Sequence, residues 1–149
     1  DMNDIAARAE RDYSEGKMLQ MLADGCICMG VKFNRQIVAH CWNNLKNCKQ
    51  NPFGLNFNLP QTYVYNFGMR TLKRYKGNGL APFLKFHNYR YLLQMGKKKY
   101  LGYIMYSNVQ SIKFHRKLNA KKSGIYLNIR FFGKYNQNFR IRRFKNDDL

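Results

Sequence analysis

The sequence predicts a mixed α/β domain, and three observations support this. The chain has 149 residues, of which 45% are hydrophobic, so it is long enough for one globular domain with a buried core. Strand-type and helix-type segments follow one another in an order that predicts an antiparallel start and one strand-helix-strand crossover. A glycine-rich junction joins a strand to the helix after it. We therefore expect a central mixed sheet flanked by helices.

The first half of the chain predicts one helix and three strands. Residues 4–23 carry Ala, Leu, Met and Glu at helical spacing and stop at an Asp-Gly pair. Residues 26–33 and 36–43 are β-type runs separated by two residues, which is the spacing of a tight hairpin. Residues 45–60 have turn residues and no period, so they predict a loop. Residues 62–70 are rich in aromatic and β-branched side chains and predict a third strand.

The second half predicts two helices and three strands. A helix over residues 80–95 is followed by a strand over 100–106 and a short helix over 108–118. Residues 125–132 and 139–144 predict two last strands on either side of a turn. The buried face of the first of these helices is predicted from residues at helical spacing: Leu80, Phe83, Leu84, His87, Tyr91 and Met95.

We expect one domain over residues 1–149. It comprises an acidic N-terminal helix (1–24), a core (25–133) and a basic C-terminal strand and tail (134–149). The chain has no run of 18 apolar residues and its N-terminus is polar, so neither a membrane span nor a signal peptide is predicted. This favours a cytoplasmic protein.

The charge of the chain is strongly one-sided. The net charge is +19, and residues 25–146 contain no Asp or Glu. Within that stretch the sequence excludes a glycosidase carboxylate pair, a carboxylate cage for magnesium or calcium, and a Ser-His-Asp triad. A field of this sign predicts a negatively charged partner. An AT-rich genome, which enriches Lys and Asn, is the alternative source of the total charge, but it does not explain the missing acids.

The four cysteines do not predict a metal site. Cys26, Cys28, Cys41 and Cys48 lack the Cys-x2-4-Cys spacing of structural zinc sites. We interpret Cys26 and Cys28 as small core residues of a strand, and we expect no bound metal.

The segment Gly77-Asn78-Gly79, between a predicted strand and a predicted helix, has the features of a phosphate-binding loop. Glycines let the backbone approach a ligand, and amides at a helix N-terminus attract anions. The basic residues Lys73, Arg74 and Lys76 precede it. The spacing differs from that of a P-loop. Taken alone, the two glycines are explained equally well by an ordinary strand-to-helix turn.

Two motifs together resemble the GNAT superfamily of acetyl-coenzyme A (CoA) dependent N-acyltransferases. Arg74-x-x-Gly77-x-Gly79 is similar to motif A of that superfamily, and residues 108–120 are similar to motif B. The resemblance covers roughly residues 20–133. It implies the GNAT fold, with acetyl-CoA or another acyl-CoA as co-substrate. The family's first strand and helix lack room before Gly25, which predicts a fragment, a trimmed chain or a diverged member.

The resemblance also implies positions for the co-substrate. The pantetheine arm pairs with the backbone near Met69, Arg70 and Thr71, and Asn108 and Ser111 line the far side. The pyrophosphate lies on the main-chain amides of a loop that Arg74 opens: Tyr75, Lys76, Gly77, Asn78, Gly79 and Leu80.

At the catalytic positions the sequence departs from the family pattern. His115 stands where the family often has a tyrosine acid, and Asn119-Ala120 replaces the usual Gly-Phe. The alternative for His115 is a packing or surface histidine of an amphipathic helix. Tyr106 is a second candidate for the acid. Because the predicted strands lack Glu, we expect the acceptor amine to lose its proton through water held by His40, tyrosine hydroxyls or backbone carbonyls, or to have a low pKa.

The leading function is transfer of an acyl group, acetyl in the first place, from CoA to a primary amine. A small neutral or anionic acceptor suits the chain, because cationic acceptors need acidic receptors. One variant resembles the long-chain N-acyl amino acid synthases. It uses an acidic acyl carrier protein, bound through the lysines at 97–99 and 121–122, for which a solvated face is the alternative.

Two other function classes stay open. Basic and aromatic residues alternate near the C-terminus, as they do on strands whose side chains stack on nucleobases. The residues concerned are Tyr126, Phe131, Phe132, Tyr135 and 140–144. Alternating Arg and Ile is also typical of a half-exposed edge strand. A catalytically inactive GNAT fold kept as a binding domain is the other alternative.

Overall fold

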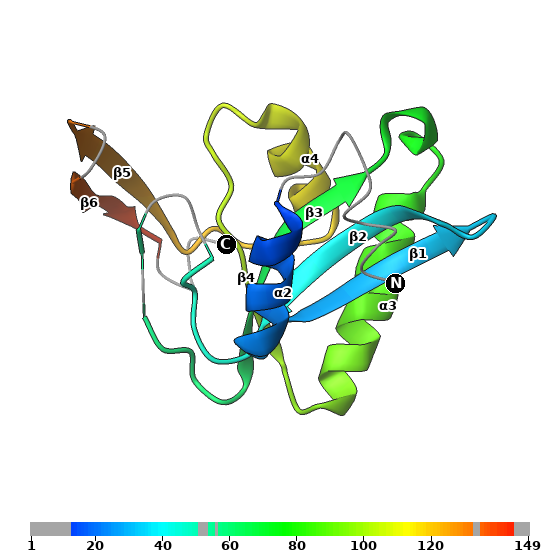
Figure 1. The fold of residues 1–149 in the computed structure, drawn as a ribbon. Helices are drawn as coiled ribbons and strands as arrows, with labels where there is room; N and C mark the ends of the chain where they lie inside the picture. Colours follow the sequence, from blue (N-terminus) through cyan, green and yellow to red (C-terminus); the bar gives the residue numbers. More distant parts are fainter. Residues whose placement is uncertain (1–12, 51–53, 56, 133–134, 145–149) are drawn as a thin grey trace. The chain divides into compact units, whose positions relative to one another are not determined.

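A computed structural model of the chain describes residues 13–50, 54–55, 57–132 and 135–144 (Figure 1). The chain divides into two compact units. Unit 1 comprises Asp1–Cys48 and Phe57–Gly102, and unit 2 comprises Lys49–Asn56 and Tyr103–Leu149.

Unit 1 begins with helix α2 (Glu15–Ala23). The Ser14 side chain caps it by accepting a hydrogen bond of 3.3 Å from the Lys17 amide. Met18 and Met21, one helical turn apart, are its buried residues. The predicted helix over 4–23 is confirmed for this part, and residues 4–12 lie outside the described residues.

The next two strands, β1 (Ile27–Phe33) and β2 (Gln36–Asn44), form the predicted hairpin. Its two-residue turn has positive φ at both positions, 46° at Asn34 and 61° at Arg35. Two successive left-handed residues match the twist of the flanking strands, and asparagine is a frequent first residue of such turns.

Strand β3 (Tyr63–Thr71) pairs antiparallel with β2 and parallel with the short strand β4 (Lys99–Leu101). The order in the sheet is β1-β2-β3-β4. The predicted strand over 100–106 is therefore too long. At Gly102 a Cβ atom would lie 3.2 Å from the Asn66 carbonyl oxygen, so the chain passes close to β3 without continuing the ladder.

A single turn of 3-10 helix, η1 (Lys73–Tyr75), leads from β3 to helix α3 (Leu80–Gln94). The predicted buried face of α3 is confirmed at Leu84, which is buried, and in part at Leu80, which is half-buried and packs against the core cluster; at the other predicted positions it is wrong. Phe83 is 52% exposed, and Tyr91 and Met95 are exposed as well. The side chains that face the sheet are those of Leu84, Lys85, Asn88 and Leu92.

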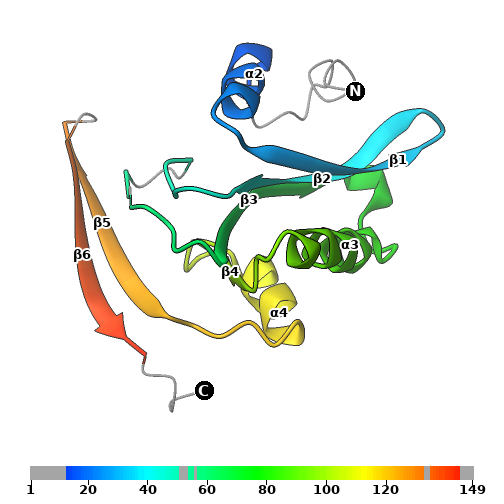
Figure 2. The same ribbon diagram turned by 90° about the horizontal axis from the view of Figure 1, so that it is seen from below.

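The two helices of unit 1 cover opposite faces of its sheet (Figure 2). On the α3 side, Ala39 and Cys41 of β2 pack with Leu84. Residues next to them in sequence, such as Trp42, point to the α2 side because side chains alternate along a strand. None of the described helices is long and apolar enough to cross a membrane.

Unit 2 contains helix α4 (Val109–Lys117) and the hairpin of β5 (Gly124–Phe131) and β6 (Tyr135–Arg143). The last strand starts four residues earlier than predicted. Side-chain hydrogen bonds between the strands, from Arg130 to Asn136 (3.1 Å) and from Asn128 to Asn138 (2.9 Å), extend the ladder through a segment that asparagines predict as a turn.

Candidate functional site

The loop between β3 and α3 contains the two glycines of the predicted phosphate site. Gly77 has φ 85° and Gly79 has φ 72°, and both values lie in the left-handed region that favours glycine. At both positions a Cβ atom would find no heavy atom within 4 Å. These glycines are therefore required by backbone conformation, and the space beside them is open to a ligand.

Helix α3 presents its N-terminus to this loop. Its first intrahelical hydrogen bond runs from the Phe83 amide to the Gly79 carbonyl (3.1 Å), so the amides before Phe83 have no acceptor within the helix. Pro82, in the first turn, has no N–H to satisfy. The first turn contains no acidic residue. The positive end of the helix dipole thus faces an open loop, which favours an anion.

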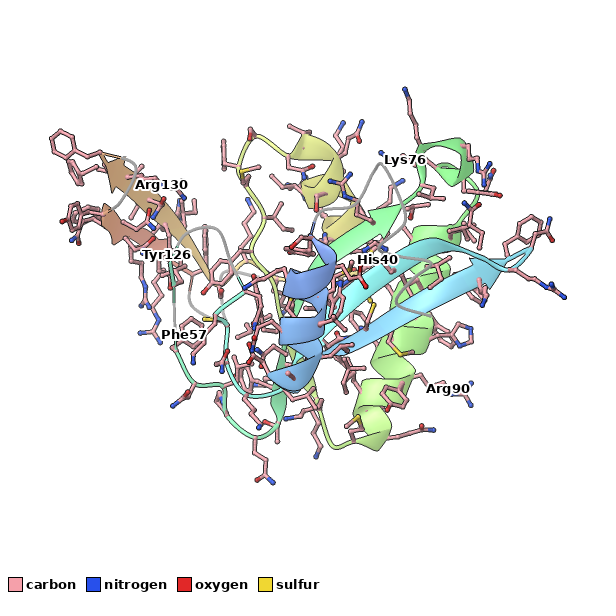
Figure 3. All side chains as sticks on the ribbon, viewed as in Figure 1. His40, Phe57, Lys76, Arg90, Tyr126 and Arg130 are labelled. Atoms are coloured by element: carbon pink, nitrogen blue, oxygen red, sulfur yellow. The ribbon has the colours of Figure 1, made fainter. Side chains whose placement is uncertain are left out.

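Basic side chains surround the loop, and Arg74 is held in place. It donates to the Gln36 side-chain oxygen, and its guanidinium lies 4.8 Å from the Tyr75 ring centroid. Tyr75 in turn meets Phe33 edge to face at 6.0 Å. Lys76 is exposed at the end of η1 (Figure 3). The amides at the start of α3 are therefore flanked by one arginine with side-chain partners and by exposed lysines.

Strand β3 carries a β-bulge immediately before the loop. Trp42 pairs with Phe67 and His40 with Arg70, so Cys41 faces two residues of β3, Gly68 and Met69. Such a bulge leaves one residue out of the ladder and exposes its backbone groups.

The bulge depends on Gly68, which sequence reasoning did not single out. Its φ is 56°, and a Cβ atom would lie 3.2 Å from the Tyr13 ring and 3.3 Å from Trp42 Cδ1. Trp42 Nε1 is the one buried side-chain nitrogen or oxygen without a hydrogen-bond partner in the described structure. The available signal was a lone glycine inside a strand pattern, which suggests a bulge or a close backbone approach.

Among the predicted catalytic residues, His40 lies in unit 1. It is half-buried on β2, directly opposite Arg70 of β3, and its side chain is on the sheet face that α2 covers (Figure 3). The structure thus brings His40 together with the predicted pantetheine strand, Met69, Arg70 and Thr71.

The other predicted site residues, Tyr106, Asn108, Ser111 and His115, lie in unit 2. The Asn108 side chain caps α4 by accepting a hydrogen bond of 3.0 Å from the Ser111 amide. His115 Nδ1 lies 2.9 Å from the Ser111 carbonyl oxygen. Because a carbonyl only accepts, Nδ1 carries the proton of the neutral ring and Nε2 remains as its basic atom. Tyr106 is 81% exposed.

A buried polar network, also missed by sequence reasoning, lies between the sheet and α3. Lys85 donates to Asn66 Oδ1, and Asn66 Nδ2 donates to Asn43 Oδ1 at 2.8 Å and to the Trp42 carbonyl at 3.0 Å. Asn43 Nδ2 donates to Asn88 Oδ1 at 2.8 Å. Pairing between β3 and β4 ends at Tyr65, so Asn66 lies at the apex where the two strands separate. We therefore call Asn43, Asn66, Lys85 and Asn88 the apex network. Burial lowers the pKa of the Lys85 amine to about 8, while the nearby Cys41 thiol opposes this shift.

The cysteines are buried or half-buried free thiols. Burial raises the pKa of Cys26 to about 11 and that of Cys28 to about 12, so both are poor nucleophiles at neutral pH. Among the described residues, no group of three or more His, Cys, Asp or Glu side chains is placed to hold a metal.

Comparison with solved structures finds acetyltransferases. The chain is similar to aminoglycoside 6'-N-acetyltransferase AAC(6')-IG from Acinetobacter haemolyticus, with a TM-score of 0.63 and 17% identity over 90% of this chain and 92% of that one. It is also similar to a ribosomal-protein-alanine N-acetyltransferase from Brucella melitensis biovar Abortus 2308, with a TM-score of 0.62 and 15% identity over 88% and 94%.

A third similar structure contains a ligand of the predicted kind. It is aminoglycoside N-acetyltransferase AAC(6')-Iy in complex with CoA, with a TM-score of 0.60 and 16% identity over 78% of this chain and 82% of that one. No protein-family model and no curated protein sequence matches the chain. At these identities the likeness concerns the fold. The mixed sheet, the crossover through α3 and these matches confirm the predicted fold class: the chain has the fold of the GNAT acetyltransferases.

Proposed function

We propose that the protein is an N-acyltransferase that moves an acyl group from CoA to a primary amine of a small neutral or anionic acceptor. The observation that carries the proposal is the loop from η1 to α3. It has two left-handed glycines with open space beside them, amides without helical acceptors, and basic neighbours. A pyrophosphate fits such a cradle, which a side chain at Gly77 or Gly79 would fill.

Within the loop from Tyr75 to Leu80, the Tyr75 amide donates to the Leu72 carbonyl (2.9 Å) and the Lys76 amide to the Lys73 carbonyl (3.2 Å). The proposed pyrophosphate donors are therefore the amides of Gly77, Asn78, Gly79 and Leu80. Arg74 opens the loop, and its anchoring by Gln36 and Tyr75 lowers the entropy that a phosphate contact costs. Lys73 and Lys76 are exposed and add attraction over a longer range.

The edge of β3 is the proposed pantetheine site. Pairing with β4 ends at Tyr65, while β3 runs on to Thr71. Beyond Tyr65 this edge can pair with an extended arm through the backbone of Met69, Arg70 and Thr71, as strand addition does. The bulge at Gly68 supplies a backbone amide for the thioester carbonyl, where negative charge develops during attack.

The reaction joins the acceptor nitrogen to the carbonyl carbon and breaks the carbon-sulfur bond, and the departing thiolate takes up a proton. We propose His115 or Tyr106 as the donor of that proton. The Nδ1 contact of His115 leaves Nε2 to carry the proton that is transferred. Proton loss from the amine goes through water at His40, tyrosine hydroxyls or backbone carbonyls, because residues 25–146 have no carboxylate.

The acceptor does not follow from the structural relatives. One acetyltransferase with this fold was solved in complex with sisomicin, an aminoglycoside, with a TM-score of 0.60 and 9% identity. Aminoglycosides are polycations, and a chain without Asp or Glu over residues 25–146 offers them little attraction. We therefore propose an acceptor such as an amino acid, an amino sugar phosphate or a nucleotide sugar, in the cytoplasm.

The structure weakens the carrier-protein variant. Lys97, the first residue of its lysine cluster, is buried, and its Nζ donates to the Leu45 carbonyl (3.2 Å) and the Gln61 carbonyl (2.7 Å). Lys99 lies over the Tyr63 ring at 5.4 Å. Part of this cluster thus stabilises the loop before β3 and the sheet edge.

The nucleic-acid alternative is weakened in a similar way. Arg140 donates to the Tyr126 hydroxyl (3.0 Å) and lies over its ring, and Arg142 lies over Phe144. The rings of Tyr126 and Phe144 thus already have arginine partners, and stacking of a nucleic-acid base on them would have to displace these contacts.

Thermal unfolding with and without acetyl-CoA tests the proposal. A ligand at 100 times its dissociation constant adds about 2.7 kcal/mol to the free energy of unfolding, so a clear rise in melting temperature is expected. Gly77→Glu should abolish the rise by filling the cradle and repelling phosphate. Gly96→Glu is the matched control, since Gly96 also has positive φ and open space but lies outside the loop.

A wild-type protein that acetyl-CoA does not stabilise would contradict the proposal. Retained stabilisation in Gly77→Glu would show that the ligand binds elsewhere. For variants that still bind acetyl-CoA, the rate at which free CoA thiol is released measures turnover and tests whether a histidine acts in catalysis. We expect His115→Ala to lose at least tenfold in turnover with binding unchanged, and His87→Ala, on the exposed side of α3, to lose little.

A further inference from the structure

Strands β3 and β4 separate next to the apex network. Their paired residues are Tyr63 with Lys99, Val64 with Tyr100, and Tyr65 with Leu101. The next residue of β3 is Asn66, whose carbonyl oxygen lies close to Gly102, the residue that follows β4. Asn66 therefore marks the apex of the separation, with the bulge at Gly68 two residues further on.

On the α3 side of the sheet, this apex is lined by polar side chains. The exposed fractions are 0% for Asn43 and Asn88, 3% for Lys85 and 8% for Asn66. The three asparagines donate to or accept from one another or the Lys85 amine, and the Tyr89 ring lies 5.1 Å from Lys85 Nζ. An apolar group entering here would separate these hydrogen bonds, and no water would replace them.

On the α2 side, the apex is occupied by packed rings. Tyr65 and Phe67 stack at 5.2 Å, and Phe67 stacks on Trp42 at 6.5 Å. Trp42 is fully buried and Tyr65 is 3% exposed. Helix α2 covers this face with its buried residues Met18 and Met21 (Figure 2). An acyl chain entering here would have to push apart a close-packed layer.

We propose that the site takes only short acyl groups, acetyl or propionyl, and that the apex network with the facing aromatic layer sets this limit. The inference rests on the proposed function, since it places the thioester at the β3 bulge. Each further methylene group must enter either hydrogen-bonded polar side chains or stacked rings. The 3% exposed fraction of Lys85 supports the first half of this argument, because water hardly reaches its amine.

Calorimetric binding of CoA and a series of acyl-CoAs, without any acceptor, tests the inference. The series is acetyl-, propionyl-, butyryl-, hexanoyl- and octanoyl-CoA. An apolar tunnel would tighten binding by about fourfold for each added methylene, the value for full burial of that group. We expect no tightening beyond propionyl-CoA in the wild-type protein.

Two variants of Lys85 test whether the apex network sets the limit on acyl chain length. Lys85→Met replaces the amine by an apolar side chain of similar length and should let affinity rise from butyryl-CoA onward. Lys85→Gln keeps a polar group and should behave like the wild type. Arg90→Met, on the exposed side of the same helix, is the matched control and should not change the series (Figure 3).

The possible results separate this inference from the proposed function. If neither CoA nor acetyl-CoA binds, the proposed function fails. If both bind and wild-type affinity rises through octanoyl-CoA, the proposed function stands and the chain-length limit is wrong. If the wild-type series is flat and Lys85→Met leaves it flat, the network does not set the limit. The wild-type series needs no variant, so it tests the limit even if Lys85→Met does not fold.

Discussion

At the scale of single residues, Lys85 is the most unusual, because a lysine side chain is buried with an exposed fraction of only 3%. Its amine lies in the core of unit 1, where Asn66 accepts its hydrogen bond and the Tyr89 ring is near. Burying an amine disfavours its charged form, and this is the main cause of its low pKa. The cost of this burial changes with pH, so it can be measured.

The stability of the protein should therefore rise with pH through Lys85. Its pKa is about 8 in the folded state against 10.5 as the ordinary value, so between these pH values the unfolded chain binds more protons. Between pH 7 and 10 the free energy of unfolding should rise by about 2.5 kcal/mol more in the wild type than in Lys85→Met. Urea titrations of both proteins at pH 7 and 10 measure the difference. Parallel pH dependence in the two proteins would contradict it.

At the scale of elements, strand β3 connects most of the features of the candidate site. It pairs with two neighbours, carries the bulge and leads into the glycine loop. The bulge depends on a left-handed residue with no side chain, packed against Tyr13 and Trp42. Helix α2 is different, since its Gly16 has no such requirement and a Cβ atom there would meet nothing within 4 Å.

Alanine at these two glycines should have opposite effects. Gly68→Ala places a Cβ atom against two rings at positive φ, and we expect it to lower the free energy of unfolding by about 1–3 kcal/mol. Gly16→Ala removes a glycine from an exposed position of α2 and should raise the free energy of unfolding by about 0.5–1 kcal/mol. Chemical denaturation of both variants checks the signs. Equal effects would show that the bulge does not need glycine.

At the scale of the whole molecule, charge is the main feature. The chain carries +19, and Asp and Glu are absent from residues 25–146. Part of this charge lies around the glycine loop, at Lys73, Arg74 and Lys76. A phosphate-bearing ligand is drawn to such a field, and dissolved salt screens exposed charges of this kind.

Binding of acetyl-CoA should therefore weaken with salt. We expect the dissociation constant to rise roughly tenfold between 50 and 500 mM NaCl, because the basic side chains at the loop are exposed. Lys76→Gln should reduce this dependence. Lys98→Gln, which removes an exposed lysine outside the loop, should change it less. Calorimetric titrations at several salt concentrations test this, and a constant affinity would mean that the phosphates do not meet these cations.

Local patterns in the sequence determined most of the elements and the loop. The hairpin turn at Asn34-Arg35, the strand before the loop and the helix after Gly79 each follow from turn chemistry, alternation or capping within a few residues. The order of these elements, with the two motifs, also predicted the fold class that the structure confirms.

Only the tertiary structure decided which sides of those elements are buried and where β3 and β4 separate. Periodicity placed Phe83 and Met95 of α3 in the core, whereas the structure buries Lys85 and Asn88, because their partners Asn43 and Asn66 come from strands far away in sequence. A polar side chain is stable in a core only when such partners meet it, and one segment of sequence cannot show them. The glycine loop was therefore predictable from the sequence, while the polar lining at the apex was not.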